Sequence, residues 1–344
     1  MWTKNAYTSS SVVVGSVGRP FPMSTTTVNP LALAGGVSAA PWWREPRARP
    51  LAAVGILLVA TGLAHVAVWG VLGGPWEGPV TWRKPILFGI SGGLTGLSLG
   101  WAWSTLPWRR EDGWLASVTA WSLLVEVLLI DLQCWRGVAS HFNRSTTLDA
   151  GLYDAMGALI LVVSLVAADL TIRVFRGPTT LEPDMHAAAL AGLVLLVVSC
   201  GLGIWVSVHG DLAAARGREP EVYGAAGVPK FPHGAAIHAL QWLPALAWAA
   251  RRAGIPPARR RSLVVAASIG SGLVLVYALV QTLSGRARFD VTPVTGTLVG
   301  LGMALVGLPW PFVGLAWIRR LRRGDTATVP GNSVPAVEPA AGHW

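Results

Sequence analysis

The chain has 344 residues, of which 52% are hydrophobic and only 13% are charged, and its formal net charge is +10. A soluble domain carries about 25% charged residues, so the composition excludes an ordinary soluble globular domain and predicts a surface that mostly faces lipid. The positive charge does not indicate nucleic-acid binding, because the arginines stand in short clusters beside apolar runs, as they do in membrane proteins.

The two ends of the chain differ from its middle. Residues 1–45 are rich in Ser, Thr, Val and Pro and hold no run of span length, so we expect a disordered N-terminal segment. Within it, Met23 is an alternative start to Met1. Residues 324–344 form a second low-complexity segment, which leaves 46–323 as the predicted transmembrane helical domain.

Eight apolar runs lie between these segments, each close to the roughly 20 residues that a helix needs to cross a bilayer core of about 30 Å. The runs are 51–73, 86–106, 113–135, 152–174, 186–208, 234–251, 262–284 and 293–318. Pro309 and Pro311 should kink or shorten the last run, so seven and nine spans remain alternatives. The predicted fold is an all-α, polytopic transmembrane helix bundle of about eight spans.

Eight spans would place both termini on one side of the membrane. The loops of that side hold 16 Lys and Arg residues, against 9 on the other side. Because an excess of Lys and Arg marks the cytoplasmic face, both termini are predicted to be cytoplasmic. The stretches "TWRKP" and "RGVASHFNRSTTLD" then fall on the external face with the long loop 209–233, which could fold over a cavity as a lid or hang as a solvated linker.

Glycines recur four residues apart in the second run and in the last. The GxxxG pairs are Gly89/Gly93, Gly92/Gly96, Gly96/Gly100 and Gly296/Gly300. Such pairs let two helices approach closely in lipid, where association depends on packing. Tight packing within one bundle is the favoured interpretation, and an oligomer interface is the alternative.

Polar residues of the third run share one helical stripe. Glu126 lies near the middle of the run, Gln133 is seven residues further on, and Arg136 is one turn beyond. A charge near the bilayer centre is costly and is a functional candidate by default. The stripe therefore indicates either a path for a proton or solute, or hydrogen bonds that fix helix packing.

Two acidic residues of the predicted spans have simpler interpretations. Asp131 lies on a different helix face from Glu126 and is expected to pair with an arginine. Asp169 stands four residues before Arg173, a spacing that favours a local ion pair.

The stretch 136–149 joins the third and fourth runs with much polar chemistry. Thr146, Thr147 and Asp149 are expected to cap the fourth helix. Capping does not account for the polar residues before them, which we expect to rim an external cavity with the starts of the second and sixth runs. The predicted lining residues are Lys84, Glu126, Gln133, Arg136, Ser140, His141, Asn143, His233, His238 and Gln241.

Five histidines would share the external half of the protein, namely His65, His141, His209, His233 and His238. Imidazole binds zinc, copper and haem iron and also shuttles protons. His141, His233 and His238 are the candidate ligands of a metal or haem. However, His233 and His238 stand about 140° apart around a regular helix, and the chain has no HxxxH, HExxH or CxxCH motif. An aqueous vestibule without a cofactor is at least as well favoured.

Three phrases, "KPILF" (84–88), "RGVASHFN" (136–143) and "HGAAIHALQ" (233–241), resemble phrases of uncharacterised multi-pass bacterial membrane proteins. The resemblance implies a bacterial cytoplasmic (inner) membrane location and brings no activity.

Three functions are consistent with the sequence, which has no Walker, dinucleotide-binding or GxSxG motif. The first is an external, histidine-bearing cavity for a metal, haem or small ligand. The second is a proton-coupled transporter or permease that uses Glu126. The third is an intramembrane hydrolase or lipid-modifying enzyme that uses Ser140, His141 and Asp149, or a bound metal, near the external leaflet. Adjacent Ser and His can pair only in a strongly bent loop.

Overall fold

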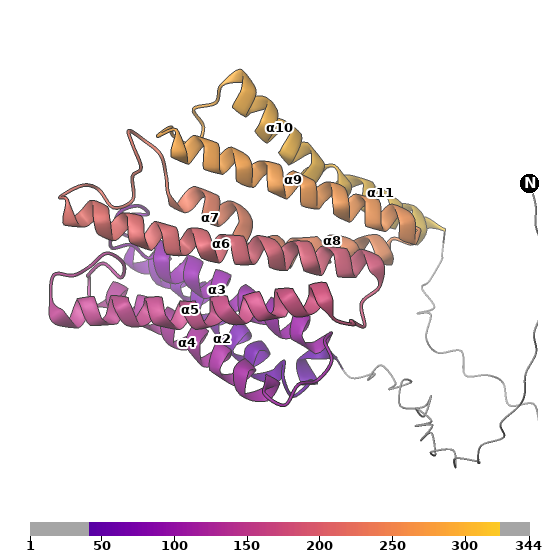
Figure 1. Ribbon diagram of the computed structural model, residues 1–344, viewed down its shortest axis with the longest axis horizontal. Helices are drawn as coiled ribbons and strands as arrows, with labels where there is room; N and C mark the ends of the chain where they lie inside the picture. The colour runs from indigo at the N-terminus through magenta and orange to yellow at the C-terminus, as the bar shows by residue number, and fades with distance from the viewer. Residues whose placement is uncertain (1–40, 324–344) are drawn as a thin grey trace, which may run out of the picture. The chain divides into compact units, whose positions relative to one another are not determined.

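The computed structural model describes residues 41–323, which are mostly helical (Figure 1). The elements are η1 (Trp42–Arg44), α2 (Arg49–Leu72), α3 (Arg83–Ser104), α4 (Asp112–Trp135), α5 (Thr147–Arg176), α6 (Pro183–Ala215), α7 (Lys230–Ile237), α8 (Ala239–Arg252), α9 (Pro257–Leu283), α10 (Pro293–Gly307) and α11 (Pro309–Arg322). Within these residues β pairing is limited to one isolated bridge between Tyr223 and Gly227. The segments expected to be disordered lie outside the described residues, except for residues 41–45, which contain η1.

Seven helical segments of the described chain are long and apolar enough to cross a membrane: α2, α3, α4, α5, α6, α9 and the stretch of α10 with α11. The chain is therefore an integral, multi-pass membrane protein. The predicted sixth run is not among these segments, because its helix is divided at His238 into α7 and α8. The predicted interruption at Pro309 is confirmed, since α10 ends at Gly307 and α11 begins with that proline.

Glycines bring α2 and α3 into close contact. A Cβ atom added at Gly89 would lie 2.7 Å from the Cα of Gly62, and one at Gly93 would lie 2.5 Å from the carbonyl oxygen of Gly55. Neither distance is compatible with a side chain, so the helices can approach this closely only at glycine. The predicted tight packing of Gly89 and Gly93 within one bundle is confirmed.

The same prediction is wrong for Gly296 and Gly300. Among the described residues a Cβ atom at Gly300 would meet nothing within 4 Å, and one at Gly296 would meet only Val291, at 4.0 Å. The close approach of α10 to α9 occurs instead at Gly270, where an added Cβ atom would lie 2.7 Å from the carbonyl oxygen of Gly302. The GxxxG spacing is present in α10, but its glycines do not face α9.

The apolar core has two main clusters, and α6 contributes to both. The first cluster includes Leu58, Trp103, Leu123 and Leu193 and lies among α2 to α6. The second includes Leu243 and Leu246 with residues of α6, α9 and α11. In Figure 1, α6 runs between α5 on one side and α7, α8 and α9 on the other. This long helix therefore connects the first part of the bundle to the second.

Charged residues distinguish the two ends of the helices. One end, which we call the basic end, holds Asp112 and Asp184 with their arginine partners and also the last residues of α11. The opposite end, which we call the histidine end, holds Lys84, His141 and Lys230, three residues close enough to interact electrostatically. The candidate site residues lie between this end and the middle of the bundle.

Candidate functional site

A polar clamp joins the end of α4 to the start of α5. The fully buried Gln133 donates from Nε2 to Asp149 Oδ1 at 3.1 Å, and Arg136 forms an ion pair with the same oxygen at 2.8 Å. Arg136 also donates to the side-chain oxygen of Gln133. The hydroxyl of Thr146 accepts the N–H of Asp149 at 3.1 Å, so the predicted helix cap is confirmed. The polar groups of Gln133 and Arg136 are thus used to join two helices.

The loop after this clamp bends sharply at Phe142, whose φ of 58° is unusual for a residue with a side chain. Its ring lies against Gly210 of α6, where an added Cβ atom would come within 2.2 Å of a ring carbon. The bend brings the hydroxyl of Ser140 to 2.9 Å from Nδ1 of His141. Asn143 stabilises the same loop by donating to the carbonyl oxygen of Ala139 at 3.0 Å. Backbone strain of this kind is often found at functional sites.

Aromatic rings surround His141. Its ring centroid lies 5.4 Å from that of Phe88, 6.0 Å from Tyr153 and 6.3 Å from Phe142. Burial lowers the pKa of His141 to about 3, and the nearby charges of Lys84 and Lys230 act in the same direction. The imidazole is therefore neutral at ordinary pH.

The two lysines near His141 have partners of their own. Lys84 donates to the carbonyl oxygen of Pro79 at 2.8 Å, and Lys230 forms an ion pair with Glu221. The carboxylate of Glu221 balances one of the two positive charges, so the histidine end keeps a local excess of positive charge around a neutral ring.

The predicted loop 209–233 is shorter in the structure, because α6 continues to Ala215 and α7 begins at Lys230. The connection between them is folded against the helices that flank it. His209, near the end of α6, has its Nε2 3.0 Å from the carbonyl oxygen of Val222, and its ring centroid lies 5.2 Å from that of Tyr223. The hydroxyl of Thr282 in α9 donates to the carbonyl oxygen of Val228 at 3.1 Å. These contacts match a folded cover of the histidine end better than a solvated linker.

His65 of α2 is held between two indole rings. The Nε1–H of Trp135 donates to His65 Nε2 at 3.1 Å, and the ring of Trp82 stacks on the imidazole at 6.1 Å. Because Nε2 accepts a hydrogen bond, the proton of the neutral ring is on Nδ1, which lies 2.9 Å from the carbonyl oxygen of Thr61 and donates to it. Both ring nitrogens are therefore occupied.

Two carboxyl groups of α4 are buried, and one of them interacts with this histidine. Glu126 is 7% exposed and Asp131 is 8% exposed, and Asp131 is within electrostatic reach of both Glu126 and His65. Among the described residues Glu126 has no hydrogen bond or ion pair. The prediction that Asp131 pairs with an arginine is wrong for the described residues. Its Oδ1 is buried without a hydrogen-bond partner, and the polar side chain near it is His65.

The sixth predicted run supplies two histidines with separate partners. The Nδ1 atom of His233 in α7 is 2.8 Å from the carbonyl oxygen of Ser199 and 3.0 Å from the hydroxyl oxygen of the same serine. His233 therefore joins α7 to α6. His238 lies at the break before α8, where its Nε2 is 3.3 Å from the hydroxyl of Ser91 in α3. Gln241 donates weakly to the carbonyl oxygen of Leu94 at 3.4 Å. His238 and Gln241 each keep one buried polar atom without a partner among the described residues.

The histidines predicted to hold a metal or haem thus contact different parts of the fold. His141 is bonded to Ser140 in a loop, His233 to α6 and His238 to α3. Within residues 41–323 no group of three or more His, Cys, Asp or Glu side chains is arranged to hold a metal ion.

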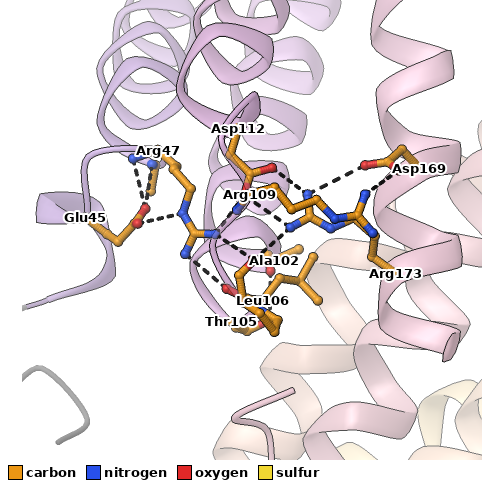
Figure 2. Close-up of polar contacts among 11 residues, drawn as sticks. Glu45, Arg47, Ala102, Thr105, Leu106, Arg109, Asp112, Asp169 and Arg173 are labelled. Atoms are coloured by element: carbon orange, nitrogen blue, oxygen red, sulfur yellow. Dashed lines mark hydrogen bonds and ion pairs between the residues drawn. The ribbon is translucent and has the colours of Figure 1, made fainter. Parts of the chain in front are cut away.

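Sequence reasoning did not find Asp112, which is the most buried acid among the described residues (Figure 2). This residue has no exposed surface and binds Arg47 at 3.0 Å and Arg173 at 2.7 Å. The backbone N–H of Arg109 donates to it at 2.8 Å. The predicted local pair between Asp169 and Arg173 is confirmed, at the longer distance of 3.6 Å. A carboxylate this buried is tolerated because it is paired.

Asp184 forms a second site of this kind at the start of α6. It is 1% exposed and pairs with Arg260 at 2.8 Å and Arg251 at 3.4 Å, while Glu182 pairs with the same two arginines at 2.9 Å. The signal available in the sequence is an acidic residue in the first turn of a span, where the helix dipole also favours negative charge.

In comparisons with known proteins, the chain matches no family model, no curated protein and no solved structure.

Proposed function

We propose that the chain is a proton-coupled transporter of a small solute in a bacterial cytoplasmic membrane, and that Glu126 and Asp131 bind the proton. The observation that carries this proposal is the pair of buried carboxyl groups in α4, neither of which has a lysine or arginine partner among the described residues. Ionisable groups in such positions are costly in a membrane and mark proton or ion pathways. The bacterial location rests on the resemblance of three short phrases alone.

The electrostatics of the pair favour proton exchange. Two carboxyl groups that interact electrostatically in a medium of low dielectric constant are costly to charge at the same time. His65 is hydrogen-bonded through both of its ring nitrogens, to Trp135 and to the carbonyl oxygen of Thr61. The carboxyl groups are thus the free proton-binding groups of this cluster.

Their positions along α4 support a path in steps. Asp131 is about 7 Å nearer to the histidine end than Glu126, from a rise of about 1.5 Å per residue. A proton entering from that end would therefore reach Asp131 first and Glu126 second. In the topology that the charge distribution favours, the histidine end faces outward.

The test is infrared difference spectroscopy of the full-length protein in lipid while the pH is changed. A protonated carboxylic acid has its own C=O band, and we expect a pH-dependent band that disappears in Glu126→Gln. Glu111→Gln is the matched control, since Glu111 is an exposed acid just before the same helix. Identical spectra for the native protein and Glu126→Gln would overturn the assignment. Proton flux into proteoliposomes under an imposed potential gives a second readout, which Glu126→Gln should lower.

A second candidate is a binding site for a small anionic ligand at the histidine end. It is favoured by the positive charge that Lys84 brings near His141, which the ion pair of Lys230 with Glu221 leaves uncompensated, and by the strained loop at Phe142. Binding of this kind would depend on Lys84 and be unaffected in Glu126→Gln, which separates the two proposals. A metal or haem in this cavity is tested by the absorption spectrum and metal content of the purified protein beside His238→Ala.

The hydrolase alternative is supported less. Ser140 and His141 do come together at 2.9 Å, but an imidazole with a pKa of about 3 is a weak base for activating a serine at neutral pH. Asp149, which would orient the histidine, is bonded instead to Gln133, Arg136 and Thr146.

A further inference from the structure

A surface cleft of about 670 Å³ lies at the basic end, between the start of α9 and the last turns of α11. Its polar lining consists mainly of four arginines, Arg259, Arg319, Arg320 and Arg323. The rest of the lining is Ala253, Gly254, Ile255, Pro256, Phe312, Leu315 and Ala316. Among residues 41–323 no acidic side chain lines the cleft, so its described lining combines positive charge with an apolar surface.

Three of the arginines in this cleft differ from their neighbours in their ion pairs. Arg251 and Arg260, just outside it, are paired with Glu182 and Asp184. Within the described part of the chain, no carboxylate forms an ion pair with Arg259, Arg319 or Arg323. The fourth arginine, Arg320, donates to the carbonyl oxygen of Arg252 at 3.0 Å.

Aromatic and apolar side chains near the cleft are of the kinds found at the depth of lipid headgroups. Trp248 and Trp317 pack edge to face, with centroids 6.0 Å apart, and Arg252 lies over the Trp248 ring at 5.3 Å. Tryptophan and arginine together are typical of a membrane–water interface. Phe312 and Leu315 are 46% and 56% exposed, which gives acyl chains an apolar surface beside the arginines.

A second groove, which shares no lining residue with the first, lies along α9. It has a volume of about 480 Å³ and begins at Arg261 and Ser262. It then follows the apolar residues Val265, Ala266 and Ile269. A cationic end followed by an apolar groove is complementary to a molecule with an anionic head and a hydrocarbon chain.

We propose that the arginine cleft between α9 and α11 binds the phosphate headgroup of an anionic phospholipid. Arginine suits this ligand, because its planar guanidinium donates two parallel hydrogen bonds to phosphate oxygens. Basic pockets between transmembrane helices on the cytoplasmic side bind anionic lipid headgroups. Free phosphate shares the headgroup chemistry but would make no use of the apolar surface at Phe312 and Leu315. The site depends on the membrane location and is independent of proton exchange at Glu126.

Native mass spectrometry of the full-length protein tests this, with phosphatidylglycerol and phosphatidylcholine compared as added lipids. We expect the native protein to retain phosphatidylglycerol preferentially. The double variant Arg319→Gln/Arg323→Gln should bind it roughly 30-fold more weakly, since each basic residue contributes about fivefold. The control is Arg216→Gln/Arg218→Gln, which removes two exposed arginines from the loop at the histidine end and should leave the preference unchanged.

Three outcomes would overturn the proposal. Equal retention of the two lipids by the native protein would show that the headgroup charge is not recognised. Equal loss in the cleft variant and in the control would show a general charge effect. Displacement of the lipid by inorganic phosphate at a similar concentration would assign the cleft to free phosphate instead.

Discussion

His141 illustrates how the fold changes the chemistry of a single residue. The bent loop puts it among aromatic rings at the histidine end, close to two lysines, and its pKa falls to about 3. A histidine that stays neutral through the physiological range can hold a hydrogen bond to Ser140 but is a poor proton shuttle. The proton-binding role proposed for this protein therefore rests on carboxyl groups rather than on its histidines.

Acid should destabilise the protein through this residue. Between its ordinary pKa of 6.5 and its folded pKa of about 3, His141 binds a proton only in the unfolded chain. Stability should fall as the pH drops through that window, by at most about 1.4 kcal/mol per pH unit. Thermal unfolding in detergent measures this, and His141→Gln should lose less stability on acidification than the native protein. If the stability of the two proteins fell in parallel as the pH is lowered, the expected low pKa of His141 would be contradicted.

At this scale, residues with local partners were predictable and residues with distant partners were not. The hydroxyl of Thr146 accepts the N–H of Asp149 at the start of α5, and Asp169 forms an ion pair with Arg173. In each case the partners are within four residues of each other, so their spacing in the sequence indicates the contact. Asp112 bonds Arg173 across 61 positions of sequence. The same limit applies to the predicted cavity residues, because their separate partners are set by which helices pack together.

Helix packing in this bundle depends on where glycines face. α2 and α3 meet through Gly55 and Gly62 on one side and Gly89 and Gly93 on the other, with backbone atoms in direct contact. The equivalent spacing at Gly296 and Gly300 makes no such contact among the described residues, and α10 approaches α9 at Gly302 instead. A GxxxG pattern thus indicates that close packing is sterically allowed, but the tertiary arrangement decides whether it occurs.

Alanine substitutions at two of these glycines should therefore change the stability of the protein in opposite directions. Gly89→Ala would push a methyl group into the backbone of Gly62, so we expect a loss of about 1–3 kcal/mol, typical of overpacking. Gly300→Ala is the matched control, because its Cβ atom would meet open space and alanine is the better helix former. Thermal unfolding of the two variants in the same detergent gives the comparison. Equal stability would mean that α2 and α3 are not held in this contact.

Helix boundaries follow the same division between what composition determines and what packing determines. Runs of about 20 apolar residues predicted the long helices, because length and hydropathy alone decide whether a helix can span a bilayer. The break at His238 was not predictable in this way, since the run 234–251 is apolar on both sides of it. The break gives α7 and α8 separate contacts, with His233 on α6 and His238 on α3.

For the molecule as a whole, charge separates the two ends of the bundle. The basic end holds the buried Asp112 and Asp184 with their arginines and the arginine cleft, whereas the histidine end holds Lys84, Lys230 and the strained loop. The ion pairs place the start of α6 beside the end of α8, so α7 and α8 together lead back to the basic end. If this pair crosses the membrane, the seven long segments and the α7–α8 pair make eight crossings.

Eight crossings with a cytoplasmic basic end can be tested by the accessibility of single cysteines. In a chain that carries Cys134→Ser and Cys200→Ser, we expect a membrane-impermeant maleimide to label Glu219→Cys in intact cells, because the loop after α6 lies at the histidine end. Arg110→Cys, in the loop between α3 and α4, should react only after the membrane is opened. A cysteine appended after Trp344 should behave like the one at position 110. The reverse labelling of the two loops would invert the orientation, and a tail that reacts in intact cells while position 110 does not would make the number of crossings odd.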